Sequence, residues 1–181
     1  MWYCKFLDLP EIPKNICESI FSNTSLTIIR DYKGWAHTRH GQEIVSANNP
    51  FYKVSDELED WLRQNIVYEY NDVGLRYAHY ESEKNTTGVH TDQTRKYVLQ
   101  YLLSSGNGIL NFWQEKGQDI IRSGRVTINN YDRLNLLESF NLPEKKWVLL
   151  NTNILHSVEL LNSDRISVQI SLNYEPLFQK T

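Results

Sequence analysis

Apolar residues recur at helical spacing in two segments of the first third of the chain. In segment 11–22, Ile12, Ile16 and Ile20 follow one another at intervals of four residues, which places them on one face of a helix. In segment 55–65, a serine stands at the position of an N-cap, ahead of apolar residues that share one face. The pattern therefore predicts two amphipathic helices.

The rest of the chain has the pattern of strands. A first strand is expected over 25–30, and a long loop over 33–50. The later expected strands are 66–70, 75–81, 89–92, 96–103, 108–114, 119–121, 126–128, 146–151, 157–161 and 165–174. Short strands at close spacing with turn residues between them predict a mainly β sandwich or barrel, because parallel α/β folds alternate strands with helices.

Length and composition support one globular domain. The chain has 181 residues, 40% of them hydrophobic and 23% charged, so wholesale disorder is excluded. We expect a single domain over 1–181, with helical and loop support and the first strands in 1–74 and a β core in 75–174. The formal net charge of −3 argues against a nucleic-acid partner, which usually requires a basic excess.

The sequence lacks the marks of secretion and of membrane insertion. No basic segment followed by an apolar run opens the chain, and no apolar stretch approaches the ~20 residues needed to span a bilayer. The two cysteines, Cys4 and Cys17, form neither a disulfide framework nor a zinc ribbon. We therefore expect a cytoplasmic protein with no membrane partner, and the oligomeric state stays open.

Candidate metal ligands occur in the second half of the chain. In an extended segment, His90 and Asp92 point to the same side, and His156 follows another apolar strand. Two histidines and one carboxylate make the facial triad of non-haem Fe(II) oxygenases, which leaves positions on the metal open. Structural zinc usually takes four protein ligands, often thiolates, and the pattern does not offer them.

A candidate anion-binding pair lies nine residues after His156. Arg165 and Ser167 open the last long strand and share one face of it. A guanidinium can bind a carboxylate through two parallel hydrogen bonds, so this pair suits the distal carboxylate of a dicarboxylate cosubstrate. Arg95, which follows the His90 motif, is expected in a solvated loop.

This ordered set resembles the Fe(II)- and 2-oxoglutarate-dependent dioxygenases, and in particular their prolyl-hydroxylase-like branch. The resemblance runs from about residue 75 to 174 and includes a glycine-containing turn and strand over 106–112. It implies a double-stranded β-helix, or jelly roll, with His90, Asp92 and His156 binding iron. It also implies that Arg165 and Ser167 bind 2-oxoglutarate.

The resemblance further assigns Tyr80 and Tyr101 to the cosubstrate pocket, at positions where oxygen-sensing prolyl hydroxylases carry tyrosines. The implied reaction uses O2, releases succinate and CO2, and hydroxylates an unactivated C–H bond; ascorbate is a further candidate cofactor. The best candidate substrate is a prolyl residue in a peptide or protein. The presence of Asp92 favours hydroxylation, because halogenating relatives have glycine or alanine there.

Alternatives remain open at this stage. The same chemistry could act on a free amino acid, another small molecule or a nucleobase, although nucleobase demethylases carry a further arginine where this chain has Ser171. The fold could also serve a cupin-like metalloenzyme that uses no 2-oxoglutarate, or a binding module without catalysis. The 33–50 loop, with Trp35 and His37, is either a lid over the substrate or a plain surface loop.

Overall fold

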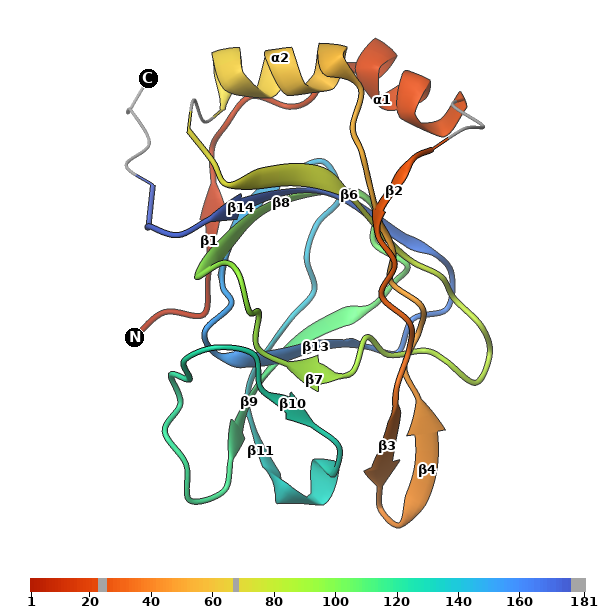
Figure 1. Cartoon of the computed structure of the whole chain (residues 1–181), viewed down its shortest axis with the longest axis vertical. Coiled ribbons are helices and arrows are strands. Elements are labelled where there is room, and N and C mark those ends of the chain that lie inside the picture. The colour runs from red at the N-terminus through yellow and green to blue at the C-terminus, as the bar shows by residue number, and fades with distance from the viewer. Residues whose placement is uncertain (23–25, 67–68, 177–181) are drawn as a thin grey trace.

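A computed structural model describes residues 1–22, 26–66 and 69–176. Two antiparallel sheets face each other, and two helices cover one of them (Figure 1). The helices are α1 (Lys14–Ser22) and α2 (Asp56–Asn65), and η1 (Tyr131–Arg133) is a 3-10 turn. The strands are β1 (Cys4–Leu7), β2 (Ile28–Arg30), β3 (Ala36–Arg39), β4 (Gln42–Val45), β5 (Phe51–Tyr52), β6 (Asp72–Ala78), β7 (Val89–His90), β8 (Tyr97–Ser104), β9 (Ile109–Glu115), β10 (Thr127–Ile128), β11 (Leu134–Phe140), β12 (Trp147–Asn151), β13 (Leu155–Glu159) and β14 (Arg165–Leu172).

The two sheets differ in size. The larger has the order β1-β12-β8-β14-β6-β5-β2, and the smaller has the order β10-β7-β13-β9-β11. A separate hairpin, β3–β4, extends beside them (Figure 1). The mainly β prediction is confirmed, and the facing antiparallel sheets are consistent with the expected jelly roll.

The two helices lie on the outer face of the larger sheet. Ile12, Ile16 and Ile20 join Leu58 and Leu62 of α2 in one buried cluster with the sheet. Ser55 accepts a hydrogen bond from the Leu58 N–H at 3.2 Å, which is the expected N-cap of α2. α1 begins at Lys14 rather than at residue 11, because Pro13 disfavours the helical conformation of the residue before it.

Strand alternation decides which side chains enter the space between the sheets. On β8, Leu99 and Tyr101 pack towards the helices, whereas Val98 and Gln100 face the smaller sheet. On β14, Val168 and its alternate neighbours join the helix-facing cluster, and the polar residues of the strand face inward. The interior between the sheets therefore carries polar groups at one end and an apolar cluster at the other.

Several expected elements are wrong. The 33–50 loop contains the β3–β4 hairpin, and the expected 119–121 strand is a single bridge between Ile121 and Ile154. Ile66 and residues 69–70 are not strand, while 67–68 lie outside the described residues, as does the start of the expected 25–30 strand. The pattern also missed β1 and β11; β11 is largely exposed and is interrupted by a bulge, so its alternation is irregular.

No helix in ranges 1–22, 26–66 and 69–176 is both long and apolar enough to cross a bilayer.

Candidate metal centre and cavity

Three side chains converge on one point between the sheets. One ligand atom from each of His90, Asp92 and His156 lies within 4.8 Å of the other two. His90 closes β7 and is paired in register with His156 of β13, so both imidazoles extend from neighbouring strands. Asp92 lies just beyond the end of β7, and its N–H donates to the Thr152 carbonyl at 3.2 Å. The chain stays extended beyond β7, so His90 and Asp92, two residues apart, point to the same side.

Both histidines have a fixed tautomer. Nδ1 of His90 lies 3.0 Å from the Gly88 carbonyl, and Nδ1 of His156 lies 2.9 Å from the Ile154 carbonyl. A carbonyl oxygen only accepts, so each Nδ1 carries the proton and each Nε2 presents a lone pair. Metal-binding histidines are usually oriented in this way, and both Nε2 atoms are free to bind a metal.

Asp92 is held as a carboxylate. Arg95 Nε donates to Asp92 Oδ2 at 2.5 Å, and His90 Nε2 lies 3.7 Å from Asp92 Oδ1. Burial alone would favour the neutral acid, but Arg95, and then the two histidines, lower the pKa of Asp92 below its usual range. One oxygen is therefore engaged by Arg95, and the other faces the histidines.

This donor set fits Fe(II). Two neutral imidazoles and one carboxylate are the ligands of a facial triad with open positions, whereas structural zinc would require a fourth protein ligand. Neither cysteine lines the cavity, so no thiolate of the described residues completes a zinc site.

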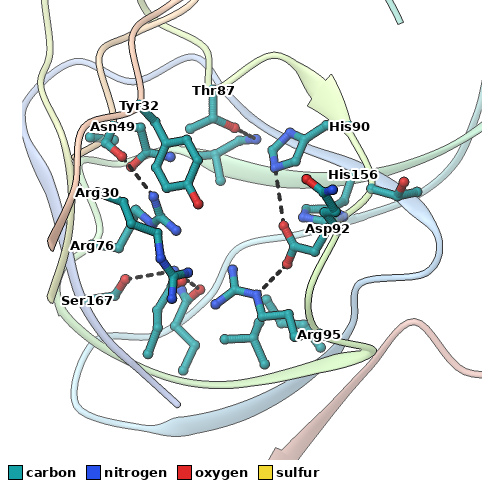
Figure 2. A pocket seen from close by; sticks show the side chains of 18 of the residues that line it. Arg30, Tyr32, Asn49, Arg76, Thr87, His90, Asp92, Arg95, His156 and Ser167 are labelled. Atoms are coloured by element: carbon teal, nitrogen blue, oxygen red, sulfur yellow. Dashed lines mark hydrogen bonds and ion pairs between the residues drawn. The ribbon is translucent and has the colours of Figure 1, made fainter. Parts of the chain in front are cut away.

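The candidate triad opens onto a cavity of about 140 Å³ (Figure 2). Residues from both sheets and from the 30–49 segment line it. Ala78, Val98, Leu110, Leu150 and Val158 make its apolar wall. The volume is small, and it suits a compact ligand.

A second polar group lies on β14. Arg165 is buried, and its Nη1 donates to the Ser105 carbonyl at 3.1 Å. Burial lowers the pKa of Arg165 to about 10, and none of the described carboxylates forms an ion pair with it. A buried guanidinium without a counter-ion is costly, so an anionic ligand would stabilise it.

Two buried amides lie on the same inward face of the larger sheet as this arginine. Gln169 Nε2 donates to Ser167 Oγ at 3.2 Å and to Gln100 Oε1 at 3.3 Å. Gln100 Nε2 and Gln169 Oε1 are buried with no hydrogen-bond partner, although both residues line the cavity. Buried polar atoms need a hydrogen-bond partner, which a polar ligand or an ordered water in the cavity can supply. Arg165 and Ser167 therefore lie on one wall, as predicted, with polar atoms that a dicarboxylate could satisfy.

The two tyrosines assigned from the resemblance do not reach this cavity. Tyr101 is buried on the helix side of β8, where its ring lies 4.9 Å from that of Trp147. Tyr80 lies beyond the end of β6 and packs against the apolar cluster between the sheets, and it is absent from the cavity lining. The assignment of Tyr101 is wrong for this chain, because the alternation of β8 turns Gln100 inward instead. Tyr80 does not line the cavity, and its assignment to the cosubstrate stays a prediction.

Sequence reasoning missed several cavity residues. Arg76 on β6 and Gln100 on β8 line the cavity because they lie on the inward faces of their strands. The sequence does not show which face of a strand points inward, so it could not identify them. Arg95 is not a solvated loop residue, since its side chain is 10% exposed and contacts Asp92. Trp35 forms part of the wall, and its ring centroid lies 5.8 Å from that of His90.

Lowering the pH from 7 towards 4 is expected to destabilise the metal-free protein. Burial, and then the neighbouring His156, lowers the pKa of His90 from 6.5 to about 4; burial also lowers the pKa of His156 and His37. Unfolding restores the ordinary pKa, so the unfolded chain binds more protons within this window. The free energy of unfolding is therefore highest above pH 6.5 and falls as the pH falls towards 4. The titration of His90 alone accounts for a loss on the order of 3 kcal/mol.

Urea unfolding of the metal-free protein at several pH values between 7 and 4 measures this effect. His90→Gln should give a shallower fall in the free energy of unfolding than wild type. His40→Gln, which removes a histidine whose side chain is 88% exposed, should follow wild type. An equally steep fall for His90→Gln would contradict the assigned pKa shift.

Comparisons with known proteins give structural neighbours only. No protein-family model and no curated protein matches the sequence. The structure is similar to a Pseudomonas putida prolyl-4-hydroxylase, at 11% identity and a TM-score of 0.45, over 96% of this chain and 93% of that chain. It is also similar to an oxidoreductase of the 2OG-Fe(II) oxygenase family from Burkholderia pseudomallei, at 9% identity and a TM-score of 0.43, over 94% of this chain and 98% of that chain.

Proposed function

We propose that the protein is an Fe(II)- and 2-oxoglutarate-dependent dioxygenase that hydroxylates an unactivated C–H bond. The observation that carries the proposal is the facial set of His90, Asp92 and His156, which opens onto a cavity whose β14 wall bears Arg165 without a counter-ion. A metal site alone would fit many proteins. The second, anion-seeking group in the same cavity favours a metal-bound dicarboxylate.

In this proposal each part of the site has a separate task. His90, Asp92 and His156 hold the iron, and Arg95 orients Asp92 through its bond to Oδ2. Arg165 and Ser167 hold the distal carboxylate of 2-oxoglutarate. When iron, 2-oxoglutarate and O2 are bound, they supply an oxidant that removes hydrogen from carbon, with succinate and CO2 as co-products. The aromatic wall at Trp35 excludes water from this region.

Two substrate classes follow from this reading. The sequence resemblance favours a prolyl residue of a peptide, which is the first candidate. The positive charge of the cavity favours a second candidate, a free amino acid or another small acid. Ascorbate would serve as a reductant that restores Fe(II) after unproductive turnover.

Anaerobic titration of the metal-free protein with Fe(II) and 2-oxoglutarate tests the reaction class. We expect a weak visible charge-transfer band that requires both components and disappears in His90→Ala. The matched control is His40→Ala, which changes an exposed histidine and should keep the band. No band from folded wild-type protein would overturn the proposal. Iron binding without any response to 2-oxoglutarate would instead favour a metalloenzyme that uses no 2-oxoglutarate.

A further inference from the structure

Positive charge is concentrated in the cavity although the chain as a whole is acidic. The formal net charge of the chain is −3. Among the described residues, the cavity lining includes six cationic side chains and a single carboxylate, that of Asp92. Three of the cations have acidic partners: Arg30 pairs with Asp72, Lys33 with Asp31 and Arg95 with Asp92. The other three are Arg76, Arg125 and Arg165.

These three differ in burial. Arg125 is exposed at the rim of the cavity, where water solvates its charge. Arg165 is buried and already has a proposed ligand in the distal carboxylate of 2-oxoglutarate. Arg76 is partly buried, and no described carboxylate forms an ion pair with it. Arg76 is therefore the inward-facing cation to which the proposed reaction assigns no ligand.

The surroundings of Arg76 hold the guanidinium in place. Its Nη1 donates to the Asn49 carbonyl at 2.8 Å. The guanidinium carbon lies 4.7 Å from the centroid of the Tyr32 ring and 4.8 Å from that of Phe51. The Tyr32 hydroxyl also accepts a hydrogen bond from this guanidinium. Because a guanidinium has five N–H groups, these bonds leave others available to a ligand.

Arg76 lies between the two parts of the proposed site. On the β6–β14 ladder it is paired with Ser167, so the two side chains share a face. Figure 2 shows Arg76 facing the metal site across the cavity, on the wall opposite Asp92 and Arg95 and beside Asn49 and Tyr32.

We infer that Arg76 binds an anionic group of the substrate, a carboxylate or a phosphate, and so selects a small acid as the molecule to be hydroxylated. The inference rests on the proposed function and names its substrate class. A prolyl residue inside a peptide offers no charge at this point, whereas a free amino acid brings its own carboxylate. Tyr32 and Asn49 of the 30–49 segment line the pocket beside the Arg76 guanidinium, where this group would bind.

Binding to the anaerobic protein loaded with Fe(II) and 2-oxoglutarate tests the inference without turnover. The probes are L-amino acids, each compared with the amide of the same amino acid, and inorganic phosphate. Their affinity is read from changes in the charge-transfer band and by calorimetry. We expect at least one free amino acid to bind about 10- to 100-fold more tightly than its amide, which lacks the carboxylate charge. That amino acid, or phosphate, should also bind about 10- to 100-fold more tightly to wild type than to Arg76→Gln. A preference for phosphate over the amino acids would identify a phosphate ester.

Three variants separate the possible roles. Arg76→Gln should remove the preference for acids, Arg76→Lys should keep part of it, and Arg125→Gln should leave it unchanged. The affinity for 2-oxoglutarate should fall in Arg165→Gln and stay within about 3-fold of wild type in Arg76→Gln.

Several results would overturn the inference. They are equal binding of acids and amides, no binding of any acid or phosphate at about 10 mM, or a preference that survives in Arg76→Gln. A loss of 2-oxoglutarate affinity in Arg76→Gln as large as in Arg165→Gln would assign Arg76 to the cosubstrate instead. The charge-transfer band of the wild-type protein is measured before any probe is added. If that band is absent, the proposed function itself has failed.

Discussion

Replacing Asp92 with asparagine is expected to weaken Fe(II) binding by about 100-fold or more while the protein stays folded, because changes to mere supporting residues of metal sites already cost about 10- to 100-fold. Asparagine keeps the shape of the side chain but removes the negative charge that faces both histidines. It also leaves Arg95, whose side chain is 10% exposed, without its partner. Anaerobic competition with a coloured chelator measures the affinity, and circular dichroism measures the fold.

A matched control for this change is a carboxylate that pairs with a residue of the cavity lining but does not line the cavity itself. Asp72 forms an ion pair with Arg30, which also lines the cavity, but it is not among the candidate ligands. Asp72→Asn therefore removes the same charge from the same neighbourhood and should leave iron affinity nearly unchanged. Equal Fe(II) affinity in wild type and Asp92→Asn would mean that the carboxylate is not a ligand, and the assigned triad would be wrong.

The sequence predicted the cluster of candidate metal ligands because the relation between two of them is local. His90 and Asp92 are two residues apart in an extended segment, and this spacing places them on one side whatever the rest of the fold does. His156 was harder to place, since it meets His90 only through the pairing of β13 with β7. Its identification relied on the resemblance to a family as much as on the residues.

The rest of the cavity depends on strand register, which a single sequence does not supply. A shift of one residue exchanges the two faces of a strand. On β8 the inward residue is Gln100, so the assignment of Tyr101 to the cosubstrate was wrong by one position. Arg76 could not be separated from a surface arginine, because its partner Ser167 lies 91 positions later on β14.

The 33–50 segment shows how tertiary contacts give order to a segment that sequence patterns describe as a loop. Its β3–β4 hairpin packs against Gly88, where φ is +72° and a Cβ would lie 2.5 Å from Trp35 Cζ2 and 2.6 Å from His37 Cε1. Only glycine allows this approach at that backbone conformation. The hairpin therefore forms a fixed part of the site, with Trp35 on the cavity wall and His37 buried behind it.

One ion pair anchors this hairpin to the smaller sheet. Arg39 Nη2 of β3 lies 2.7 Å from Glu159 Oε2 of β13, and the Glu159 side chain is 4% exposed. Thr86, Tyr131 and Ser157 donate hydroxyl hydrogen bonds to the other oxygen of Glu159. Arg39 supplies the positive charge in this network, and it also lies over the Tyr131 ring at 4.0 Å.

Replacing Arg39 with leucine is expected to lower the free energy of unfolding by about 2–3 kcal/mol, because the change leaves the charge of Glu159, which is 4% exposed, without a counter-ion. The cost stays at the low end for a buried pair, because Arg39 itself is 30% exposed. Urea denaturation of the metal-free protein at pH 7 measures the change. The same substitution in a Glu159→Gln background should cost much less, since glutamine keeps the acceptor and removes the charge. The difference between the two costs is the coupling between Arg39 and Glu159.

An exposed ion pair provides the comparison. Lys146 and Glu11 are joined at 3.1 Å, but their side chains are 56% and 54% exposed, so Lys146→Leu should cost less than about 1 kcal/mol. If Arg39→Leu costs no more than Lys146→Leu, the hairpin is not held by this pair. A large coupling, by contrast, would mean that Glu159 fixes the hairpin that places Trp35 beside His90, and that the cavity wall depends on a buried charge outside it.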